Sequence, residues 1–344
     1  MQRAWNGLFV EELTQVLRDL GEPAFRAKQI FHFFHAERGV DLAQATTLSK
    51  ALREKVRTAP VAKAEIRKVL TSRDGTKKLL LAFGDAVIET VFMPYADRNT
   101  LCVSTQVGCR QGCAFCASTK APFGRNLRAE EILQEVYVAE RLLQTRVDNV
   151  VLMGIGEPLD NYEEVLRFLR LVTDPAGKNL SARSITLSTC GLVPEIYRLA
   201  QEGMPINLAI SLHHTSDAKR QRTMPVARRY SIAEILDACR FYFAHTGRRI
   251  SFEYVLIRGE NDGEEEVQWL CENLSDPRFH VNLIPLNEIR EFGGQSAQEE
   301  ARVTFQKRLE RGGVRVTLRK KRGADIEGAC GQLRIAYCNE MEEG

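Results

Sequence analysis

The stretch LCVSTQVGCRQGCAFCAST, residues 101–119, holds four of the nine cysteines in the chain. Cys109, Cys113 and Cys116 follow the spacing C-x3-C-x2-C, and Cys102 stands seven positions before the first of them. Such a cluster, within an odd total, is typical of metal or redox chemistry and not of a disulfide framework. Iron–sulfur clusters usually take four thiolates. Three thiols would hold a four-iron cluster by three irons and leave the fourth open to a small molecule.

A zinc site is the alternative interpretation of the same cysteines. Structural zinc normally takes four ligands, often as two separated Cys pairs, and no second pair follows here. His213 and His214 could complete such a site. The protein would then be a non-catalytic, zinc-stabilised RNA-binding protein. The open iron accounts for the missing fourth ligand better, so we favour the iron–sulfur cluster.

Six short apolar runs, separated by helical patterns, begin at this stretch and continue along the chain. They lie at 100–105, 148–153, 183–188, 206–212, 249–257 and 279–285. Alternating strands and helices predict an α/β fold with a parallel sheet. Six such units predict a sheet curled into a partial β/α barrel, similar to a TIM barrel.

Polar or glycine-rich segments follow the carboxyl ends of these runs. They are GIGEP at 154–158, STCG at 188–191, SLHH at 211–214 and PLNE at 285–288. In a β/α barrel, the loops at the carboxyl ends of the strands form one rim, where active sites lie. We therefore expect these segments and the cysteine stretch to converge on one site.

The residues before the cysteine stretch fall into two regions. In the first 58, apolar residues such as Leu13, Leu17 and Leu20 recur at helical spacing, and Gly21 then ends the pattern. From about residue 60 to 98, apolar runs separated by RDG and GDA predict β-hairpins. We therefore divide the chain into a helical N-terminal domain (1–58), a β-hairpin linker region (59–98) and a core with a C-terminal segment (99–344).

Composition and charge restrict the class of protein. Charged residues make up 27% of the chain, and no apolar run reaches membrane-spanning length. The first residues do not resemble an export signal, so we expect a cytoplasmic protein without membrane contact. The first 70 residues carry 12 Lys and Arg against 8 Asp and Glu, and RKKR occupies 319–322. These basic segments are either solvated surface or phosphate contacts.

Several motifs distributed along the chain resemble those of one known family. In order, they are IETVFMP (88–94), CVSTQVGC (102–109), GIGEP, SLHH, IPLN (284–287) and RGADIEGACGQL (322–333). Together with the N-terminal region, they resemble the RlmN/Cfr family of bacterial radical S-adenosylmethionine RNA methyltransferases over nearly the whole chain. Cys102 and Cys330 make the resemblance specific, because the wider superfamily of radical S-adenosylmethionine enzymes does not require cysteines at these positions. Ile155 and His214 depart from the more usual GMGEP and SLHA.

The resemblance implies a role for each matched residue. Cys109, Cys113 and Cys116 would ligate one [4Fe–4S] cluster. S-adenosylmethionine would be held by Gly156, Glu157, Ser188, Ser211, Leu212, His213 and Asn287. Cys330 would carry a methyl group, Cys102 would resolve the product, and Glu89 would accept a proton. Without the resemblance, Glu89 would be an outward hairpin carboxylate and Ser188 an end-of-strand hydroxyl. Cys239 and Cys271 fit a buried structural role, whereas Cys190 and Cys338 match no family role.

The reaction that the resemblance implies consumes two molecules of S-adenosylmethionine per turnover. The first methylates Cys330. The second is cleaved to a 5′-deoxyadenosyl radical, which takes a hydrogen atom from the new S-methyl group. The carbon radical adds to carbon 2 of an adenine, and Cys102 then attacks the Cys330 sulfur to release the methylated base.

The implied partners are RNA and an electron donor. The family modifies adenine in the peptidyl transferase centre of 23S ribosomal RNA, and often also an adenine in a transfer RNA anticodon loop. Flavodoxin or ferredoxin would supply electrons to what we expect to be a monomer. Methylation at carbon 8, the reaction of the other branch of the family, is the alternative. IETVFMP and CVSTQVGC look more like the carbon-2 branch.

Overall fold

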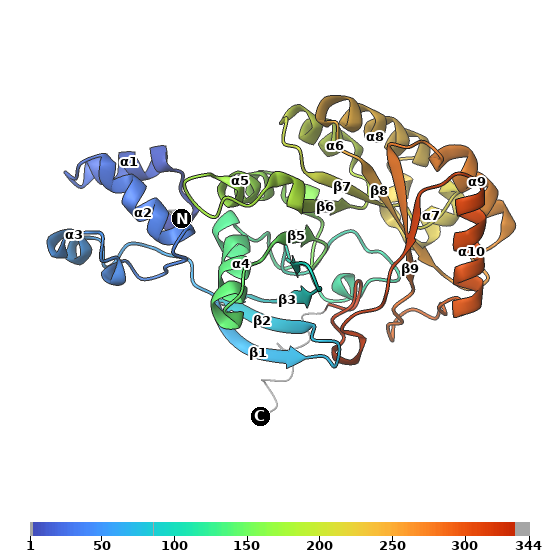
Figure 1. Cartoon of the computed structure of the whole chain (residues 1–344), viewed down its shortest axis with the longest axis horizontal. Helices are drawn as coiled ribbons and strands as arrows, with labels where there is room; N and C mark the ends of the chain where they lie inside the picture. Colours follow the sequence, from blue (N-terminus) through green and yellow to red (C-terminus); the bar gives the residue numbers. More distant parts are fainter. Residues whose placement is uncertain (1–2, 85, 334–344) are drawn as a thin grey trace.

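The computed structural model describes residues 3–84 and 86–333 (Figure 1). The N-terminal region is helical as predicted, with α1 (Val10–Asp19), α2 (Phe25–His35) and α3 (Lys50–Lys55). The apolar stripe of α1 faces inward, because Leu13 and Leu17 are fully buried. None of the helices in the described ranges is long and apolar enough to span a membrane.

The described strands form one ten-stranded sheet in the order β1 to β10. The strands are β1 (Glu65–Thr71), β2 (Lys77–Phe83), β3 (Ala86–Pro94), β4 (Asn99–Cys102), β5 (Asn149–Leu152), β6 (Ile185–Thr189), β7 (Asn207–Ser211), β8 (Ile250–Leu256), β9 (Phe279–Pro285) and β10 (Val316–Leu318). Strands β1 to β4 are antiparallel to one another, whereas β4 to β10 are all parallel. The six predicted strands correspond to β4–β9, so the β/α architecture is confirmed.

Two features of the sheet were not predicted from the sequence. The hairpin region continues the barrel sheet, because β3 pairs with β4 and places Val91 opposite Cys102. Strand β10 then extends the other edge, parallel to β9. The first predicted parallel strand, 100–105, is also shorter in the structure. After Cys102 the chain leaves the ladder, and Ser104 donates from its backbone N–H to the Glu135 carboxylate (2.9 Å).

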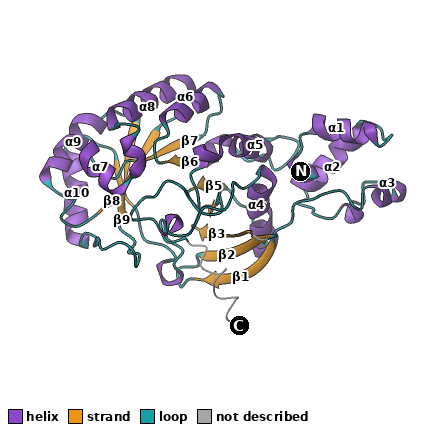
Figure 2. Cartoon of the chain, turned by 180° about the vertical axis from the view of Figure 1, so that it is seen from behind, coloured by secondary structure: helices purple, strands orange, loops and turns teal. Residues whose placement is uncertain are grey.

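Seven helices of the described chain cover the outside of the parallel strands (Figure 2). They are α4 (Ala129–Leu143), α5 (Tyr162–Thr173), α6 (Val193–Gln201), α7 (Asp217–Thr223), α8 (Ile232–Thr246), α9 (Glu264–Leu274) and α10 (Glu299–Arg311). Most of them return the chain from the carboxyl end of one strand to the amino end of the next. The loops that precede these helices therefore gather on a single rim, as the β/α pattern requires.

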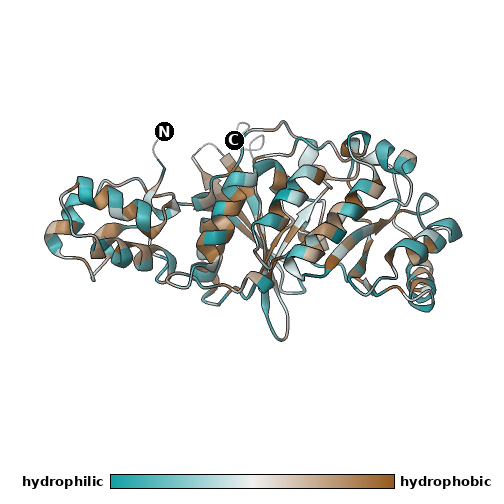
Figure 3. Ribbon diagram, turned by 90° about the horizontal axis from the view of Figure 1, so that it is seen from above, coloured by the Kyte–Doolittle hydropathy of each residue, from teal (hydrophilic) through white to brown (hydrophobic). Residues whose placement is uncertain are grey.

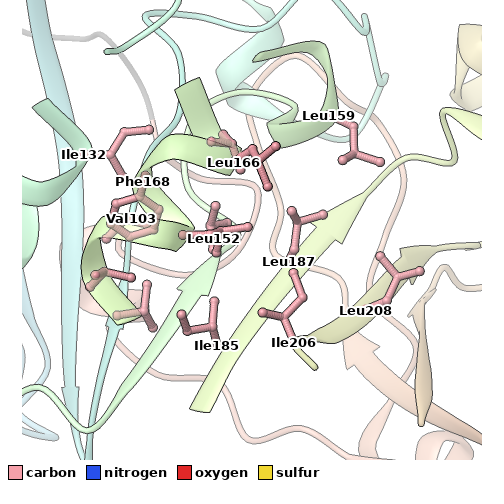
Figure 4. Close-up of a cluster of buried hydrophobic side chains, with 14 of the residues drawn as sticks. Val103, Ile132, Leu152, Leu159, Leu166, Phe168, Ile185, Leu187, Ile206 and Leu208 are labelled. Atoms are coloured by element: carbon pink, nitrogen blue, oxygen red, sulfur yellow. The ribbon is translucent and has the colours of Figure 1, made fainter. Parts of the chain in front are cut away.

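The core between strands and helices consists of aliphatic and aromatic side chains from consecutive units (Figure 4). Leu152 of β5, Leu187 of β6 and Leu208 of β7 are at most 1% exposed, and Phe168 of α5 packs over the same layer. Burying such a side chain contributes roughly 1.5–3 kcal/mol to folding. This layer fixes the strand ends that carry the site.

The N-terminal helices form a lobe at one end of an elongated molecule (Figure 3). The lobe contacts α4 and α5 of the barrel. Arg167 of α5 donates to both carboxylate oxygens of Glu12 (2.7 and 2.8 Å), and Arg3 bonds to Glu130 of α4 (2.8 Å). Apolar residues of the lobe and of the barrel belong to one continuous buried cluster. The lobe is therefore packed firmly against the barrel.

Candidate active site

Residues from the carboxyl ends of the parallel strands and from the C-terminal segment line one cavity on the carboxyl rim. Those predicted from the sequence are Cys109, Cys113, Cys116, Gly156, Glu157, Ser188, Ser211, His213, Asn287 and Cys330. Among the residues predicted to bind S-adenosylmethionine, Leu212 is the exception, because its side chain is fully buried in the core. The structure thus brings together residues that lie more than 200 positions apart in the chain.

The cysteine loop is held in place by its own backbone and by neighbouring segments. The Thr119 hydroxyl donates to the carbonyls of Cys113 (3.0 Å) and Cys116 (2.9 Å). Gly108 adopts φ +81°, and a Cβ there would lie 2.7 Å from the Pro122 carbonyl oxygen. Glycine is therefore required where this loop closes on itself.

The donor set of the cavity fits a cluster better than a single ion. All three thiols line its wall, and the charge of Cys116 raises the pKa of Cys113, after the larger effect of burial. Within the described residues, no three His, Cys, Asp or Glu side chains close around one metal ion. A four-iron cluster is wider than one ion and binds each thiolate through a different iron. The three thiols line one cavity and can therefore share such a cluster.

The two histidines of the zinc interpretation do not converge on the cysteines. His213 lines the cavity, but its Nδ1 accepts a hydrogen bond from the backbone N–H of Val255 (3.1 Å). Burial lowers the pKa of His213 to about 3, so its ring is neutral. The ring of His214 is buried against Thr223, with Nε2 3.0 Å from the hydroxyl oxygen. The unusual His214 therefore does not line the cavity.

The GIGEP segment is fixed by close packing and by Glu157. Gly156 adopts φ +109°, and a Cβ there would lie 2.7 Å from the Gln106 side chain. Glu157 accepts from the backbone N–H of Leu159 through one oxygen (3.0 Å) and from that of Cys190 through the other (2.8 Å). Burial raises the pKa of this carboxyl group. The side chains of Thr189 and Cys190 also form hydrogen bonds with this carboxylate.

Arg220 supports this site, although no sequence motif points to it. Its guanidinium is fully buried and donates to the carbonyl oxygens of Cys190 (2.6 Å), Ser211 (3.2 Å) and Leu212 (3.2 Å). It thus ties the end of β7 to the loop after β6. Its positive charge also lowers the pKa of Cys113, against the larger raising effect of burial. In DAKRQRT it looks like any surface arginine of an amphipathic helix.

A second cavity adjoins the first and contains Cys102 and Cys330. The two residues are 228 positions apart in the sequence, and both are free thiols. Cys102 is buried at the end of β4, whereas Cys330 is exposed and lines both cavities. Burial, followed by the charge of Cys330, raises the pKa of Cys102. Asn287 holds the Cys330 segment by donating to its backbone carbonyl (3.0 Å).

The remaining sequence-predicted residues have the following places. Glu89 is buried in β3 and paired with Lys78 (3.1 Å), so the expectation of an outward hairpin carboxylate is wrong. Cys190 lines the first cavity beside the cysteine loop, with its sulfur 3.6 Å from the Gln111 side-chain oxygen. Cys239 is fully buried in α8. Cys338 lies outside the described residues.

The partial barrel and its cysteine loop define a class of protein, the radical S-adenosylmethionine enzymes. The family model described as "Radical SAM superfamily" matches residues 103–270. A second model, "Ribosomal RNA large subunit methyltransferase N-terminal domain", matches residues 6–61. Membership of the superfamily implies a [4Fe–4S] cluster and S-adenosylmethionine as cofactors.

Individual relatives narrow the class to a family. A "Probable dual-specificity RNA methyltransferase RlmN" of Clostridium perfringens is 48% identical over 331 residues, 95% of each chain. One of Lachnospira eligens is 43% identical over 97% of this chain and 96% of its own length. A crystal structure of a radical SAM methyltransferase from Sphaerobacter thermophilus superposes with a TM-score of 0.93, at 42% identity, covering 97% of this chain and 99% of that chain. The chain therefore belongs to the RlmN family of radical SAM enzymes.

Proposed function

We propose that the protein methylates carbon 2 of adenine in 23S ribosomal RNA and in a transfer RNA anticodon loop. The relatives named as dual-specificity RNA methyltransferases support RNA as the substrate. The observation that carries the proposal is the second cavity, where Cys102 and Cys330 line one space beside the cysteine loop. Two thiols so placed suit a reaction in which one carries a methyl group and the other releases the product.

The first cavity is the proposed site of the cofactors. Cys109, Cys113 and Cys116 would hold the cluster, which when bound supplies the electron that cleaves S-adenosylmethionine. The other predicted residues that line this cavity surround the open side of the cysteine loop. Glu157 lines this cavity, and its carboxylate would attract the ammonium group of S-adenosylmethionine through charge-assisted hydrogen bonds, which are strong. His213, being neutral, adds no competing positive charge.

Cys330 is the proposed methyl carrier. Carbon 2 of adenine lies between two ring nitrogens and is electron-poor, so it does not attack a sulfonium methyl group. A cysteine thiolate does so readily. Cys330 lines both cavities, so its sulfur can accept a methyl group on one side and present the activated carbon on the other. One molecule of S-adenosylmethionine is spent on methylation of Cys330 and a second on hydrogen abstraction from the S-methyl group.

Cys102 is the proposed resolving thiol. The carbon bonds to the ring, and the resulting radical adduct gives up one electron, for which the cluster would be the acceptor, and the ring proton; the Cys102 thiolate then attacks the Cys330 sulfur. The carbon–sulfur bond breaks, a disulfide forms and the released carbon takes up a proton to complete the methyl group. Reduction of the disulfide by a dithiol or another two-electron reductant then returns the enzyme to its starting state. Glu89 is retained as the proposed acceptor of the ring proton.

The test is an anaerobic reaction of the reconstituted protein with transcribed fragments of 23S ribosomal RNA and of transfer RNA. Nucleosides from the digested RNA are compared by mass spectrometry with authentic standards. We expect 2-methyladenosine, with one 5′-deoxyadenosine and one S-adenosylhomocysteine formed per methyl group. A product that co-migrates with 8-methyladenosine would assign the protein to the carbon-8 reaction. No methylated adenosine from fully reconstituted protein would refute the proposal.

A further inference from the structure

The two cavities share a wall but differ in what lines them. Met153, Ile284, Asn287, Arg319 and Cys330 line both. The three cysteines of the C-x3-C-x2-C motif line only the first, and Cys102 lines only the second. The second cavity extends from Cys102, at the carboxyl end of β4, to Tyr95 and Arg98, which precede the amino end of that strand.

The charges of the second cavity are of one sign. Five cationic side chains line it, namely Arg98, Arg319, Lys320, Lys321 and Arg322, and its described lining residues include no Asp or Glu. The first cavity, in contrast, contains Glu157 and Glu253. Arg319 pairs with Glu253 (3.3 Å), whereas Arg98, Lys320 and Lys321 are exposed. A groove lined by one sign of charge concentrates a polyanion such as nucleic acid.

Planar groups gather at the end of the cavity that is remote from Cys102. The turn between β3 and β4 is closed by a hydrogen bond from the Tyr95 N–H to the Arg98 carbonyl (2.8 Å). The Arg322 guanidinium lies 4.3 Å from the centroid of the Tyr95 ring, and that of Arg98 lies 5.1 Å from it. Arg322 also donates to the Pro94 carbonyl (2.9 Å), which fixes it over the ring. Tyr95 and Arg322 are half-buried, whereas Arg98 is exposed.

We propose that the second cavity is the entrance for single-stranded RNA, and that Tyr95, Arg98 and Arg322 hold the nucleotides beside the reacting adenine. The inference rests on the proposed function and extends it to the side on which the substrate enters. Tyrosine rings and guanidinium planes stack on unpaired bases, and guanidinium groups also bind phosphates. An adenine that has left its stack can then reach Cys330 and Cys102 at the inner end.

This arrangement separates the two ligands of the reaction. S-adenosylmethionine occupies the side of Cys330 that faces the cysteine loop, and the RNA occupies the opposite side. The lining has five cations and no carboxylate, so it would not pair with the basic groups of a peptide. It therefore favours an anionic chain that carries bases, such as RNA. Lys320 and Lys321, both exposed at the rim, would contact phosphates without reading sequence.

The experiment measures the affinity of a fluorescent RNA stem-loop for the reconstituted protein at several salt concentrations. Tyr95→Leu should weaken binding about tenfold through lost stacking. Arg98→Ala should weaken it less, and should reduce the salt slope by about one if Arg98 contacts a phosphate. Steady-state methylation by both variants should show a raised KM for the RNA. Iron content, S-adenosylmethionine affinity and thermal unfolding report whether each variant is correctly folded.

Matched controls lie elsewhere on the molecule. Tyr230 is a half-buried tyrosine with Arg229 5.1 Å from its ring centroid, and Arg240 is paired with Asp237 much as Arg98 is paired with Asp97. Tyr230→Leu and Arg240→Ala should bind RNA like the unmodified protein. If unmodified protein, Tyr95→Leu and Arg98→Ala had equal affinity and equal KM for the RNA, the proposal of an RNA entrance would be overturned. If the two variants bind more weakly but unmodified protein yields no methyladenosine, the entrance stands and the proposed function fails.

Discussion

Cys102 and Cys330 differ in their surroundings although they line the same cavity. Cys102 is buried at the end of a strand, and Cys330 is exposed in an irregular segment held by Asn287 and by a hydrogen bond from Ala117 to the Gly331 carbonyl (2.7 Å). The buried thiol is protected and burial raises its pKa, whereas the exposed thiol lines both cavities. This asymmetry agrees with a methyl carrier at Cys330 and a resolving thiol at Cys102.

The two cysteine roles predict opposite outcomes for two variants. Cys330→Ala should stop the reaction before RNA becomes attached, because no S-methyl group can form. Cys102→Ala should still add the activated carbon to adenine, but no thiolate can then release it. A denaturing gel should show RNA linked to Cys102→Ala and none linked to Cys330→Ala. The reverse pattern would exchange the two roles, and Cys239→Ala, which changes a buried core cysteine, serves as a control.

The ion pair of Glu89 and Lys78 allows a structural role to be separated from a catalytic one. Both side chains are at most 6% exposed, so Glu89→Leu alone leaves a buried ammonium group and should cost roughly 3–5 kcal/mol of unfolding free energy. Replacing both, as Lys78→Met with Glu89→Leu, should restore most of that loss. If Glu89 accepts the ring proton, the stable double variant should still fail to methylate RNA. Urea unfolding and nucleoside analysis provide the two measurements, and an active double variant would remove Glu89 from the mechanism.

Single residues could be predicted from the sequence where chemistry imposes a spacing. Three thiols within eight positions require a shared ligand, so their convergence follows from the motif alone. Arg220 could not be found in this way, because its role is to donate hydrogen bonds to carbonyl oxygens at the ends of β6 and β7, which lie elsewhere in the sequence. Glu89 was similarly ambiguous, since a hairpin carboxylate is usually solvated, whereas this one is buried and paired with Lys78 of β2.

Elements were predictable where their pattern is local. The period of the N-terminal apolar residues predicts α1 and α2, and the alternation after residue 100 predicts β4–β9. The attachment of β3 to β4 was not predictable, because adjacent runs joined by a short turn can pair without belonging to the barrel. Strand β10 is only three residues long and has no distinctive pattern. The pairing of β3 and the pairing of β10 each require an edge of the parallel sheet, and such an edge forms only when the chain folds.

The contact of α1 with α5 leads to a prediction about how the lobe is held. Arg167 binds both oxygens of Glu12 and the Gly7 carbonyl (2.9 Å), and lies 4.6 Å from the Phe9 ring centroid. Arg167→Ala should weaken the docking of α1 by about 1–2 kcal/mol, since the pair is partly exposed. Hydrogen exchange of the α1 amides should then be about ten times faster. Arg170→Ala, on the same helix but paired with Glu202 of the barrel, should leave this exchange unchanged.

The lobe packs against the barrel in one buried cluster, and the two cavities lie between the sheet and the C-terminal segment. The barrel contributes the cofactor side, and the C-terminal segment returns to place Cys330 between the cavities. The same segment supplies four of the five cations of the proposed entrance. The contact between the lobe and the barrel joins these parts, so its stability concerns the whole molecule.

His35 lies at that contact and makes it sensitive to pH. It is fully buried at the end of α2, and its Nδ1 is 2.9 Å from the hydroxyl of Tyr137 in α4. Burial lowers the pKa of His35 to about 3. The pKa of a histidine in an unfolded chain is about 6.5. Below about pH 6.5 the unfolded chain therefore binds a proton that the folded protein does not bind. The stability that neutral His35 confers is full above that pH and is lost progressively as the pH falls towards 3.

A comparison of His35→Gln with unmodified protein tests this dependence. Glutamine can still reach the Tyr137 hydroxyl but does not titrate. Between pH 6.5 and 5, the unfolding free energy of the unmodified protein should fall more steeply than that of the variant, by up to about 1.4 kcal/mol per pH unit. Urea unfolding of anaerobically prepared protein at several pH values gives both slopes, and His245→Gln, on the exposed end of α8, should behave like unmodified protein. Parallel curves for His35→Gln and unmodified protein would show that His35 takes up its proton equally well in the folded state, and that the lobe–barrel contact is not the source of any acid sensitivity.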